Sequence, residues 1–273
     1  LEATEPGWNH GILYDEPDNL RDLEIITDLD MIRATLDDLL IDFPWAGEAD
    51  RQNFIGLMLT PLLRPAIRGN VPMHLIQSPL ERTGKTKLVE QVLGITICGD
   101  SISATPFPAK EEERQKTVHS MLLTGATILH LDNLRRFVDS AVLASLLTAR
   151  DFQGRLLGGN TVADLPNRLV IVATGNNVRA TGEIIKRCVP VCLQPRDDQP
   201  EKRKDFKHKN LPEYLRRNRR RVLGCLLGMI RNWADQGGRA CGDHLGGFEE
   251  WSGLVGGVLW FHGYTQWRQQ ETE

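Results

Sequence analysis

Hydrophobic residues recur at helical spacing near both ends of the chain and form short apolar runs in its middle. Helical stripes are expected over residues 30–43, 50–63, 219–233 and 248–263. Asp50 has the chemistry of a helix N-cap, and Pro61 is expected to kink or divide the helix that contains it. The pattern therefore predicts a pair of helices on each side of a central region.

The central region alternates apolar runs with helical stretches. The apolar runs, which predict buried strands, are residues 73–77, 126–131, 168–173 and 189–193. The helical stretches between them are residues 84–94, 109–124, 139–149 and 181–187. Such alternation predicts an α/β fold with a mostly parallel sheet covered on both faces. Residues 153–165 differ, because strand-like flanks around a Gly-Gly-Asn centre predict a β-hairpin.

The same pattern divides the chain into parts. We expect a linker or extended segment at 1–29, a helical part at 30–68, the alternating core at 69–195, and a basic segment with a C-terminal helical part at 196–273. The chain begins with Leu1 rather than Met, so we expect a piece of a longer protein.

Composition is that of a folded protein. Of the 273 residues, 41% are hydrophobic and 25% are charged, which allows a sizeable core. No segment approaches the roughly 18 uncharged apolar residues of a membrane span. The five cysteines are few and odd in number, which favours a reducing compartment. Cys188 and Cys192 have no second pair at zinc spacing, so we expect no metal site there.

Charge is segregated along the chain, although the formal net charge is only −3. Residues 1–50 hold fourteen acidic residues against two arginines, and residues 196–221 hold eleven lysines and arginines against five acids. A near-neutral total does not exclude a polyanionic partner when cations are gathered in this way. The basic run either neutralises phosphates or is an ordinary solvated linker and helix face.

The most specific motif is Thr83-Gly84-Lys85-Thr86, which follows an apolar strand and opens a helix. The P-loop pattern is G-x-x-x-x-G-K-[ST], and here it reads PLERTGKT, with Pro79 in place of the first glycine. Lys85 is expected to reach the β- and γ-phosphates of a nucleotide, and the Thr86 hydroxyl to bind Mg²⁺. The residues expected around the phosphates are Pro79, Arg82, Thr83, Gly84, Lys85, Thr86 and Lys87.

A second apolar strand ends in Asp132, which is expected to join the coordination shell of Mg²⁺. Asn133 stands where many ATPases have a second acid, and an amide orients water but cannot accept its proton. Either a carboxylate from elsewhere is the base, or turnover is slow. Candidates for that carboxylate are Glu111, Glu112 and Glu113. His130 lies inside the apolar run and is expected to be a core histidine.

Two further positions complete the set. Asn176 ends the strand that starts near Val170, where an amide positions water beside a γ-phosphate, although Asn-Asn pairs also form ordinary turns. Arg187 follows Lys186 at the end of a helix. It either complements the dipole of that helix or extends as an arginine finger into the nucleotide site of a neighbouring subunit.

In order, PLERTGKT, ILHLDN, VATGNN and Lys186-Arg187 resemble the Walker A, Walker B, sensor 1 and arginine-finger motifs of AAA+ ATPases. The chain is also similar to the superfamily-three-like helicase domains of phage, plasmid and integrative-element replication proteins, which are often fused to a primase. This likeness covers about residues 30–265 and rests on DFPWAGEADRQNFIGLMLTPLLRPAI, ATGNNVRATGEIIKRCVPVCLQP and GGFEEWSGLVGGVL. It implies a five-stranded sheet, a ring that commonly has six subunits, and ATP-driven movement on DNA.

The resemblance also assigns roles. The residues expected to act in catalysis are Lys85, Asp132, Asn133, Asn176 and Arg187. The 153–165 hairpin stands where related ring helicases contact DNA, but its tip, Gly158-Gly159-Asn160, has no basic or aromatic residue, and Arg155 is the nearby cation. Arg219 or Arg220 is a candidate for a lid residue that reaches back to the nucleotide.

These features predict an ATP-dependent DNA helicase or translocase domain of a mobile-element replication protein. It would use ATP and Mg²⁺ at the subunit interfaces of a ring in a bacterial or phage-infected cytoplasm. Its partners would be single-stranded or forked DNA and a fused or associated primase. One alternative is a slow or non-hydrolysing ATP switch that oligomerises to load or recruit replication proteins. Another is a phosphotransferase for a small molecule, but no segment offers an obvious acceptor-binding lid.

Overall fold

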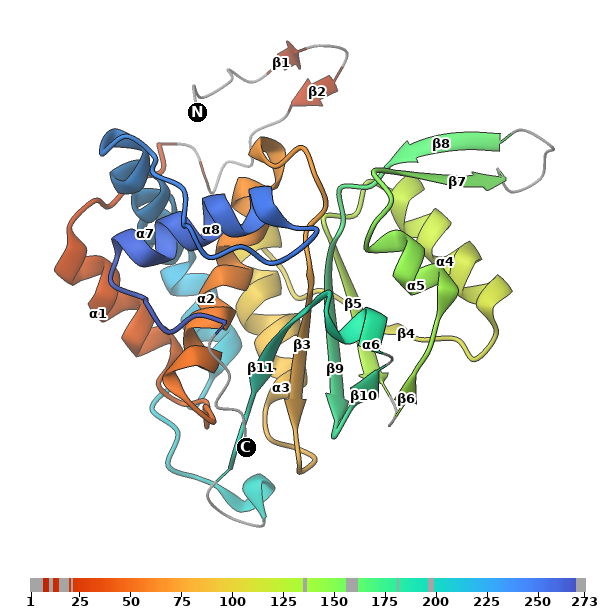
Figure 1. Cartoon of the computed structure of the whole chain (residues 1–273). Helices are drawn as coiled ribbons and strands as arrows, with labels where there is room; N and C mark the ends of the chain where they lie inside the picture. The colour runs from red at the N-terminus through yellow and green to blue at the C-terminus, as the bar shows by residue number, and fades with distance from the viewer. Residues whose placement is uncertain are drawn as a thin grey trace.

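A twisted sheet stands in the middle of the molecule, with helices on both of its faces (Figure 1). The computed structural model describes residues 7–9, 12–14, 20, 22–134, 137–155, 162–180, 182–195 and 199–268. Among these residues, no helix is long and apolar enough to cross a membrane.

Five parallel strands form the central sheet, in the order β11, β3, β9, β5, β4. Their bounds are β3 (Met73–Ser78), β4 (Thr105–Pro106), β5 (Ile128–Leu134), β9 (Val170–Asn176) and β11 (Cys188–Cys192). The predicted α/β fold with a parallel five-stranded sheet is therefore confirmed. The hydrophobic pattern did not locate β4, because two residues that include a proline carry no strand signal.

Helices of both chain ends, together with the helix that follows β3, cover one face of the sheet. They are α1 (Leu29–Leu40), α2 (Glu48–Leu63), the 3₁₀ turn η2 (Arg64–Ala66), α3 (Lys85–Lys87), η3 (Leu88–Cys98), α7 (Leu211–Asp235) and α8 (Glu249–Phe261). α3 continues directly into η3, which is wound as a π-helix. The other face is covered by α4 (Glu111–Leu123), α5 (Ala141–Leu146) and α6 (Gly182–Ile185).

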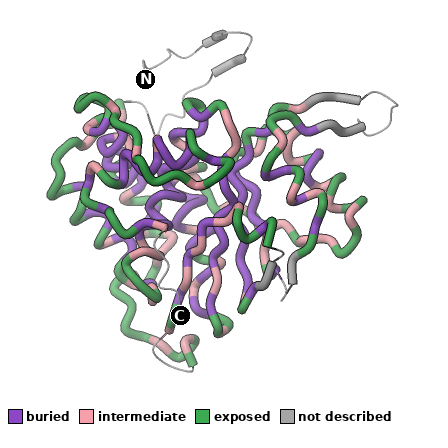
Figure 2. Tube along the Cα trace, in the orientation of Figure 1, coloured by how far each residue is buried: buried purple, intermediate pink, exposed green. Residues whose placement is uncertain are grey.

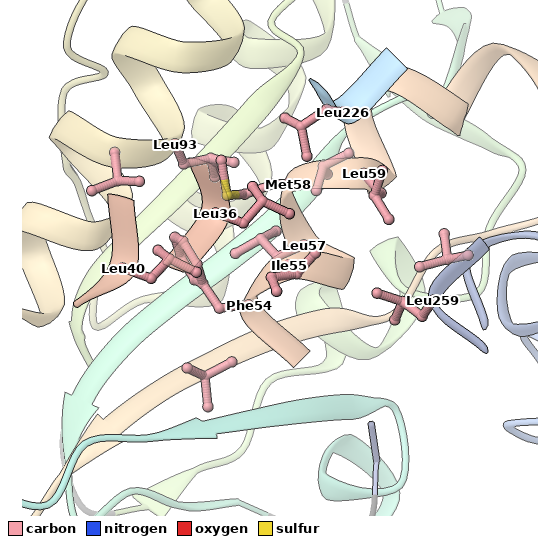
Figure 3. Close-up of a cluster of buried hydrophobic side chains, with 14 of the residues drawn as sticks. Leu36, Leu40, Phe54, Ile55, Leu57, Met58, Leu59, Leu93, Leu226 and Leu259 are labelled. Atoms are coloured by element: carbon pink, nitrogen blue, oxygen red, sulfur yellow. The ribbon is translucent and has the colours of Figure 1, made fainter. Parts of the chain in front are cut away.

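The two faces of the sheet bury two separate cores. Along β9, Val170 and Val172 join the core under α2, η3 and α7, whereas Ile171 and Ala173 join the core under α4 and α5. Figure 2 shows the buried residues concentrated in the sheet and the helices against it, and Figure 3 shows part of the first core. The helical parts at both chain ends thus share one core with the sheet, while the division at residues 29, 68 and 195 stays a prediction.

An extended segment, residues 22–28, lies directly on the glycine face of α7. The Ile26 N–H donates to the Gly224 carbonyl (3.0 Å), and the Asn232 side chain donates to the Thr27 carbonyl (2.8 Å). A Cβ atom at Gly228 would lie 1.7 Å from the Ile26 carbonyl oxygen. Glycine is therefore required here by close approach of a second backbone rather than by helix geometry.

The N-terminal helices differ from expectation in two places. Gly47 rather than Asp50 is the N-cap of α2, and the Asp50 carboxylate accepts a hydrogen bond from the Cys192 N–H (2.7 Å) at the end of β11. Asp50 therefore ties α2 to the sheet. Pro61 lies inside α2, which continues to Leu63 before it tightens into η2, so the proline does not divide the helix.

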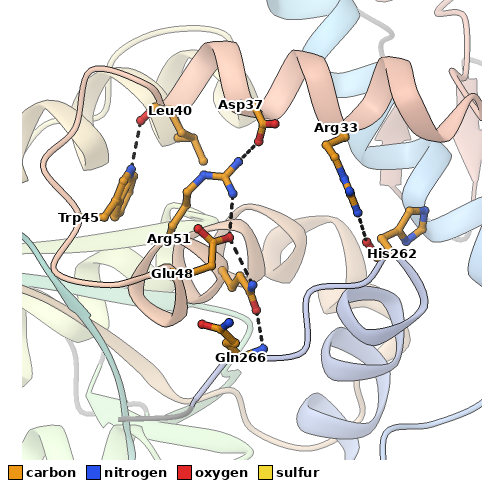
Figure 4. A network of polar contacts seen from close by, with 9 residues as sticks. Arg33, Asp37, Leu40, Trp45, Glu48, Arg51, His262 and Gln266 are labelled. Atoms are coloured by element: carbon orange, nitrogen blue, oxygen red, sulfur yellow. Dashed lines mark hydrogen bonds and ion pairs between the residues drawn. The ribbon is translucent and has the colours of Figure 1, made fainter. Parts of the chain in front are cut away.

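A polar network joins α1 and α2 to the C-terminal residues (Figure 4). Arg51 forms ion pairs with Asp37 on α1 and with Glu48, at 2.9 Å, on its own helix. Gln52 accepts a hydrogen bond from the Gln266 N–H (2.8 Å). The network therefore fixes the segment after α8 against the N-terminal helices.

Small strand pairs lie outside the central sheet. They are β1 (Gly7–Asn9) with β2 (Ile12–Tyr14), β6 (Phe137–Val138) with β10 (Arg179–Ala180), and β7 (Asp151–Arg155) with β8 (Val162–Pro166). The antiparallel pairing of β7 and β8 confirms the predicted hairpin, which extends from one side of the molecule (Figure 1). Its tip, Gly158-Gly159-Asn160, lies outside the described residues. A short 3₁₀ turn, η4 (Pro200–Lys202), precedes α7.

Candidate functional site

The P-loop connects β3 to α3 through two residues of left-handed backbone. Arg82 has φ of 57° and Gly84 has φ of 99°. Gly84 is the N-cap of α3, and a Cβ atom there would lie 3.4 Å from the Phe43 ring. Glycine therefore provides both the turn and the close packing that let the helix begin at Lys85.

Lys85 lies at the start of this helix with its side chain folded back into the loop. It is 8% exposed, and its ammonium donates to the Leu80 carbonyl (2.9 Å) and to the Thr83 hydroxyl (3.2 Å). Burial lowers the pKa of Lys85, although the negative charges of Glu81 and Asp132 oppose this effect. The loop thus holds a cation against its own oxygen atoms, where phosphate oxygens would serve as stronger partners.

The end of β5 is irregular, and this irregularity exposes Asn133. The register between β5 and β9 shifts between Leu131 and Leu134, and Asn133 has φ of 56°. The bulge turns Asn133 away from the sheet ladder, while Asp132 remains beside β9. His130, one pleat earlier, is buried, and burial lowers its pKa to about 4, so it is neutral at pH 7 as a core histidine is expected to be.

Thr174 on β9 connects the residues at the end of β5, and sequence reasoning did not identify it. Its hydroxyl donates to Asp132 Oδ1 and accepts from the Asn133 N–H (3.3 Å). It also lies 3.5 Å from Nε2 of His130. The available signal was its position two residues before Asn176, because alternate residues of a strand face the same side. One buried hydroxyl therefore orients Asp132 and holds the bulge.

β9 ends in Asn176, whose side-chain oxygen is buried and has no hydrogen-bond partner within the described part of the chain. Gly175 precedes it, and a Cβ atom there would lie 2.6 Å from the Leu134 carbonyl oxygen. The glycine lets the end of β9 approach the bulge of β5. A buried amide oxygen without a partner is costly, so Asn176 is suited to a ligand that brings a donor such as an ordered water.

One cleft of about 1270 Å³ gathers most of the predicted site residues. Those that line it are Arg82, Thr83, Gly84, Lys85, Thr86, Lys87, Asp132, Asn133 and Asn176. The register pairs Ser78 with Asn176, so the ends of neighbouring parallel strands meet at the same edge of the sheet. Pro79 is exposed at the entry of the loop, outside this lining, and its carbonyl accepts from the Asn177 side chain (3.5 Å).

Acids that follow or belong to α1 hold a basic segment over the cleft. Asp42 accepts from the N–H groups of Lys207 (2.9 Å) and His208 (2.8 Å) and forms an ion pair with Arg203 (3.6 Å). Asp38 pairs with Lys207 (2.7 Å). Burial raises the pKa of Asp38, but hydrogen bonds from the Lys207 and Tyr214 side chains outweigh burial, and the net pKa is lowered. We call residues 199–212 the roof segment, because most of its residues line the same cleft as the P-loop residues.

The two proposed lid arginines lie elsewhere. Arg219 is buried, and its guanidinium donates to the Ile95 (3.0 Å) and Thr96 (3.2 Å) carbonyls at the end of η3. Arg220 donates to the Asp22 carbonyl (2.8 Å). Neither residue lines the cleft, and both donate to backbone carbonyls of neighbouring elements, so the structure does not support the lid prediction for either. Arg203 of the roof segment lines the cleft instead.

Arg187 lies at the opposite edge of the sheet from the cleft of its own chain. It immediately precedes β11, whose first residue pairs with Met73 at the start of β3. Its guanidinium donates to the Ala144 carbonyl (3.1 Å) and to Glu183 (2.8 Å). Lys186 beside it is exposed. The structure thus separates Arg187 from Lys85, Asp132 and Asn176 within one chain.

The candidate general bases do not reach the cleft. Glu111 accepts from the Ser140 hydroxyl and the Val142 N–H, both at 3.1 Å, and pairs with Arg114. Glu112 and Glu113 pair with Lys116 on the exposed side of α4. Glu111 therefore joins α4 to the start of α5, while Glu112 and Glu113 pair within α4, and the interpretation of any of them as the base is not supported.

The oxygen atoms in the cleft fit a hydrated Mg²⁺ bound with a nucleotide. Thr86 supplies a hydroxyl and Asp132 a carboxylate, the hard ligands that Mg²⁺ prefers. Among the described residues, no group of three or more His, Cys, Asp or Glu side chains forms a metal site. A pair of protein oxygens suits Mg²⁺ that binds mainly through phosphates and water, rather than an all-protein metal cage.

Solved structures show the same fold. One, described as the A-form apo structure of the NrS-1 C-terminal region, matches with a TM-score of 0.54 and 14% identity, over 82% of this chain and 52% of that chain. A second, described as the A-form apo structure of the NrS-1 C-terminal region (305–718), matches with a TM-score of 0.51 and 13% identity, over 84% of this chain and 52% of that chain. The chain thus spans about half the length of these structures, and the likeness concerns the fold alone. Neither a family model nor a curated protein matches the chain.

Proposed function

We propose that the chain is the ATPase domain of a DNA helicase or translocase from a mobile-element replication protein. The observation that carries this proposal is the single cleft that joins Lys85 and Thr86 of the P-loop to Asp132 and Asn176 of two neighbouring strands. Lys85 binds the β- and γ-phosphates, and Thr86 and Asp132 hold Mg²⁺, which neutralises charge as the γ-phosphate leaves. The AAA+ assignment belongs to this proposal.

Asn176 orients the attacking water. Its unpartnered oxygen accepts a hydrogen bond from that water, which faces the γ-phosphate held by Lys85. Thr174 keeps Asp132 in place through its hydroxyl. The roof segment closes over the nucleotide because Asp38 and Asp42 hold it against α1.

Arg187 completes the site of a neighbouring subunit, so the active form is a ring, most simply a hexamer. This role is supported by its distance from the cleft of its own chain and by its fixed position between Ala144 and Glu183. A finger held in this way loses little side-chain entropy when a second subunit docks. DNA passes along the ring in the cytoplasm of a bacterial or phage-infected cell, and a primase is fused or associated.

Mixing two inactive variants tests this arrangement. Lys85→Ala removes the nucleotide site and Arg187→Ala removes the finger, so each variant alone is expected to lose ATP hydrolysis. In a 1:1 mixture, roughly a quarter of random interfaces pair an intact site with an intact finger, and activity should return to about that fraction. A mixture as inactive as its components, with Arg187→Ala still folded and binding ATP, would show that Arg187 does not act in trans.

A second candidate function is a slow ATP switch that assembles a ring to load or recruit replication proteins. It is favoured by Asn133, because an amide at the bulge cannot take the proton of water. Strand displacement on forked DNA, measured beside molecular mass with and without ATP, separates the two. ATP-dependent assembly with negligible hydrolysis that DNA does not stimulate would favour the switch.

A further inference from the structure

Four arginines gather at the base of the β7–β8 hairpin. Arg150 directly precedes β7, and Arg168 lies between β8 and β9. The Asn167 N–H donates to the Arg150 carbonyl (2.8 Å), so the two flanks of the hairpin are joined at its base. Arg64 and Arg68 come from η2 and the loop before β3. All four therefore lie near the edge of the sheet where β3 and β9 begin.

Arg64 is a buried clamp that holds this arrangement together. It is 6% exposed and donates to the Ile67 carbonyl (2.8 Å) and the Asn167 carbonyl (2.6 Å), the residues just before Arg68 and Arg168. Its Nε atom and the Asn167 side-chain oxygen are buried without a partner in the described part of the chain. The fold thus keeps a buried cation between two loops that each present a further arginine.

The exposed arginines of this group are not tied up in ion pairs within the described part of the chain. Arg68, Arg150 and Arg168 are exposed, and no ion pair within the described residues involves them. Two acids lie close by, Glu250 and Asp151. One oxygen of Glu250 is already taken by the N–H groups of Arg68 (2.9 Å) and Gly69 (2.8 Å). Burial, and then the charge of Arg168, lower the pKa of Arg64, whereas Glu250 opposes them, so Arg64 and Arg168 lie near enough for their charges to repel.

We propose that Arg68, Arg150 and Arg168 bind the phosphate backbone of a single DNA strand that lies across the base of the β7–β8 hairpin. The proposal rests on the proposed function in taking DNA as the partner. Guanidinium groups bind phosphate oxygens in pairs of hydrogen bonds, and a polyanion relieves the repulsion within the cluster. The basic run at 202–221 is less suited, because Asp38 and Asp42 already hold Arg203 and Lys207 and Arg219 is buried.

The test compares two triple variants of the full chain with equal loss of charge. The first is Arg68→Gln with Arg150→Gln and Arg168→Gln. The control is Lys110→Gln with Arg217→Gln and Arg239→Gln, three exposed cations outside both the cleft lining and the roof segment. Binding of a fluorescent oligo-dT strand is measured by anisotropy from low to moderate salt, and a fluorescent ATP analogue is titrated on the same samples.

The arginine variant is expected to bind oligo-dT at least about 30-fold more weakly, with a salt slope lower by about 2, because each lost phosphate contact removes roughly 0.7 from it. The control should change little. Equal binding by the arginine variant, or an equal loss in the control, would overturn the proposal. A wild-type chain that binds the ATP analogue but no DNA would also overturn it, whereas loss of ATP binding alone would count against the proposed ATPase and leave the DNA comparison readable.

Discussion

Gly228→Ala tests the contact between α7 and the extended segment 22–28. An added methyl group would lie 1.7 Å from the Ile26 carbonyl oxygen, far inside van der Waals distance. At Gly224, one turn earlier, it would lie 2.3 Å from the Glu24 carbonyl oxygen. Both obstacles are backbone atoms, which cannot rotate aside as a side chain does. The segment must therefore leave the helix before the methyl group fits.

The expected loss follows from the contacts that hold the segment. Hydrogen bonds of Ile26, Asn232 and Arg220 join it to α7 within the described residues. At about 1 kcal/mol each, their loss costs about 3 kcal/mol. Alanine is a better helix former than glycine by about 1 kcal/mol, which offsets part of this cost. We expect the free energy of unfolding to fall by about 2 kcal/mol.

Urea unfolding followed by circular dichroism measures this change, and Gly253→Ala on α8 is the matched control. A Cβ atom at Gly253 would meet only the Ala240 Cβ, at 3.5 Å, so the control should keep or gain stability. In a chain that lacks residues 1–28, Gly228→Ala should also become stabilising, because its obstacle is gone. If Gly228→Ala in the full chain is as stable as the wild type, the close approach inferred here is refuted.

Three further outcomes are expected. Thr174→Val should slow ATP hydrolysis 10- to 100-fold with little change in ATP affinity, as loss of an outer-shell partner does, while Thr174→Ser should stay active in a phosphate-release assay. Valine and serine variants of equal activity would exclude the positioning role. His74 is buried in β3, and burial lowers its pKa to about 3. Protonation of this histidine in the unfolded chain therefore lowers the free energy of unfolding as the pH falls below about 6.5. Between pH 6.5 and 5, the free energy of unfolding of His74→Phe should therefore fall by about 2 kcal/mol less than that of the wild type. An unchanged pH dependence in urea titrations would contradict this. Asp42→Asn should weaken ATP binding several-fold by loosening the roof segment, and calorimetric titration that shows wild-type affinity would argue against the roof.

The sheet and the floor of the cleft were predictable because their signals are local. Apolar runs that end in Asp132 or Asn176 place both residues at one edge of a parallel sheet. The P-loop sequence follows a third apolar run, β3, and begins a helix at the same edge. Parallel strands bring their carboxyl ends together whatever the intervening sequence. The residues that follow each apolar run could therefore be expected to lie close together.

What the sequence did not reveal depends on partners that are distant along the chain. The hydroxyl of Thr174 donates to Asp132, forty-two positions earlier in the chain. The buried guanidinium of Arg219 donates to carbonyls more than one hundred and twenty positions away. The glycines of α7 weaken a helix by local propensity, and only the segment laid across them explains their presence. Such pairings leave no periodic pattern in the sequence.

The ion pairs that hold the roof segment have a consequence for how any assay of this protein is read. Asp38 and Asp42 hold the segment partly through charges at its surface, and added salt weakens such pairs. Salt also weakens phosphate contacts to nucleic acid. For the proposed ATPase, a salt titration would therefore act on two ligands at once. An apparent loss of DNA-stimulated turnover at high ionic strength would then contain a contribution from nucleotide released by the opened cleft.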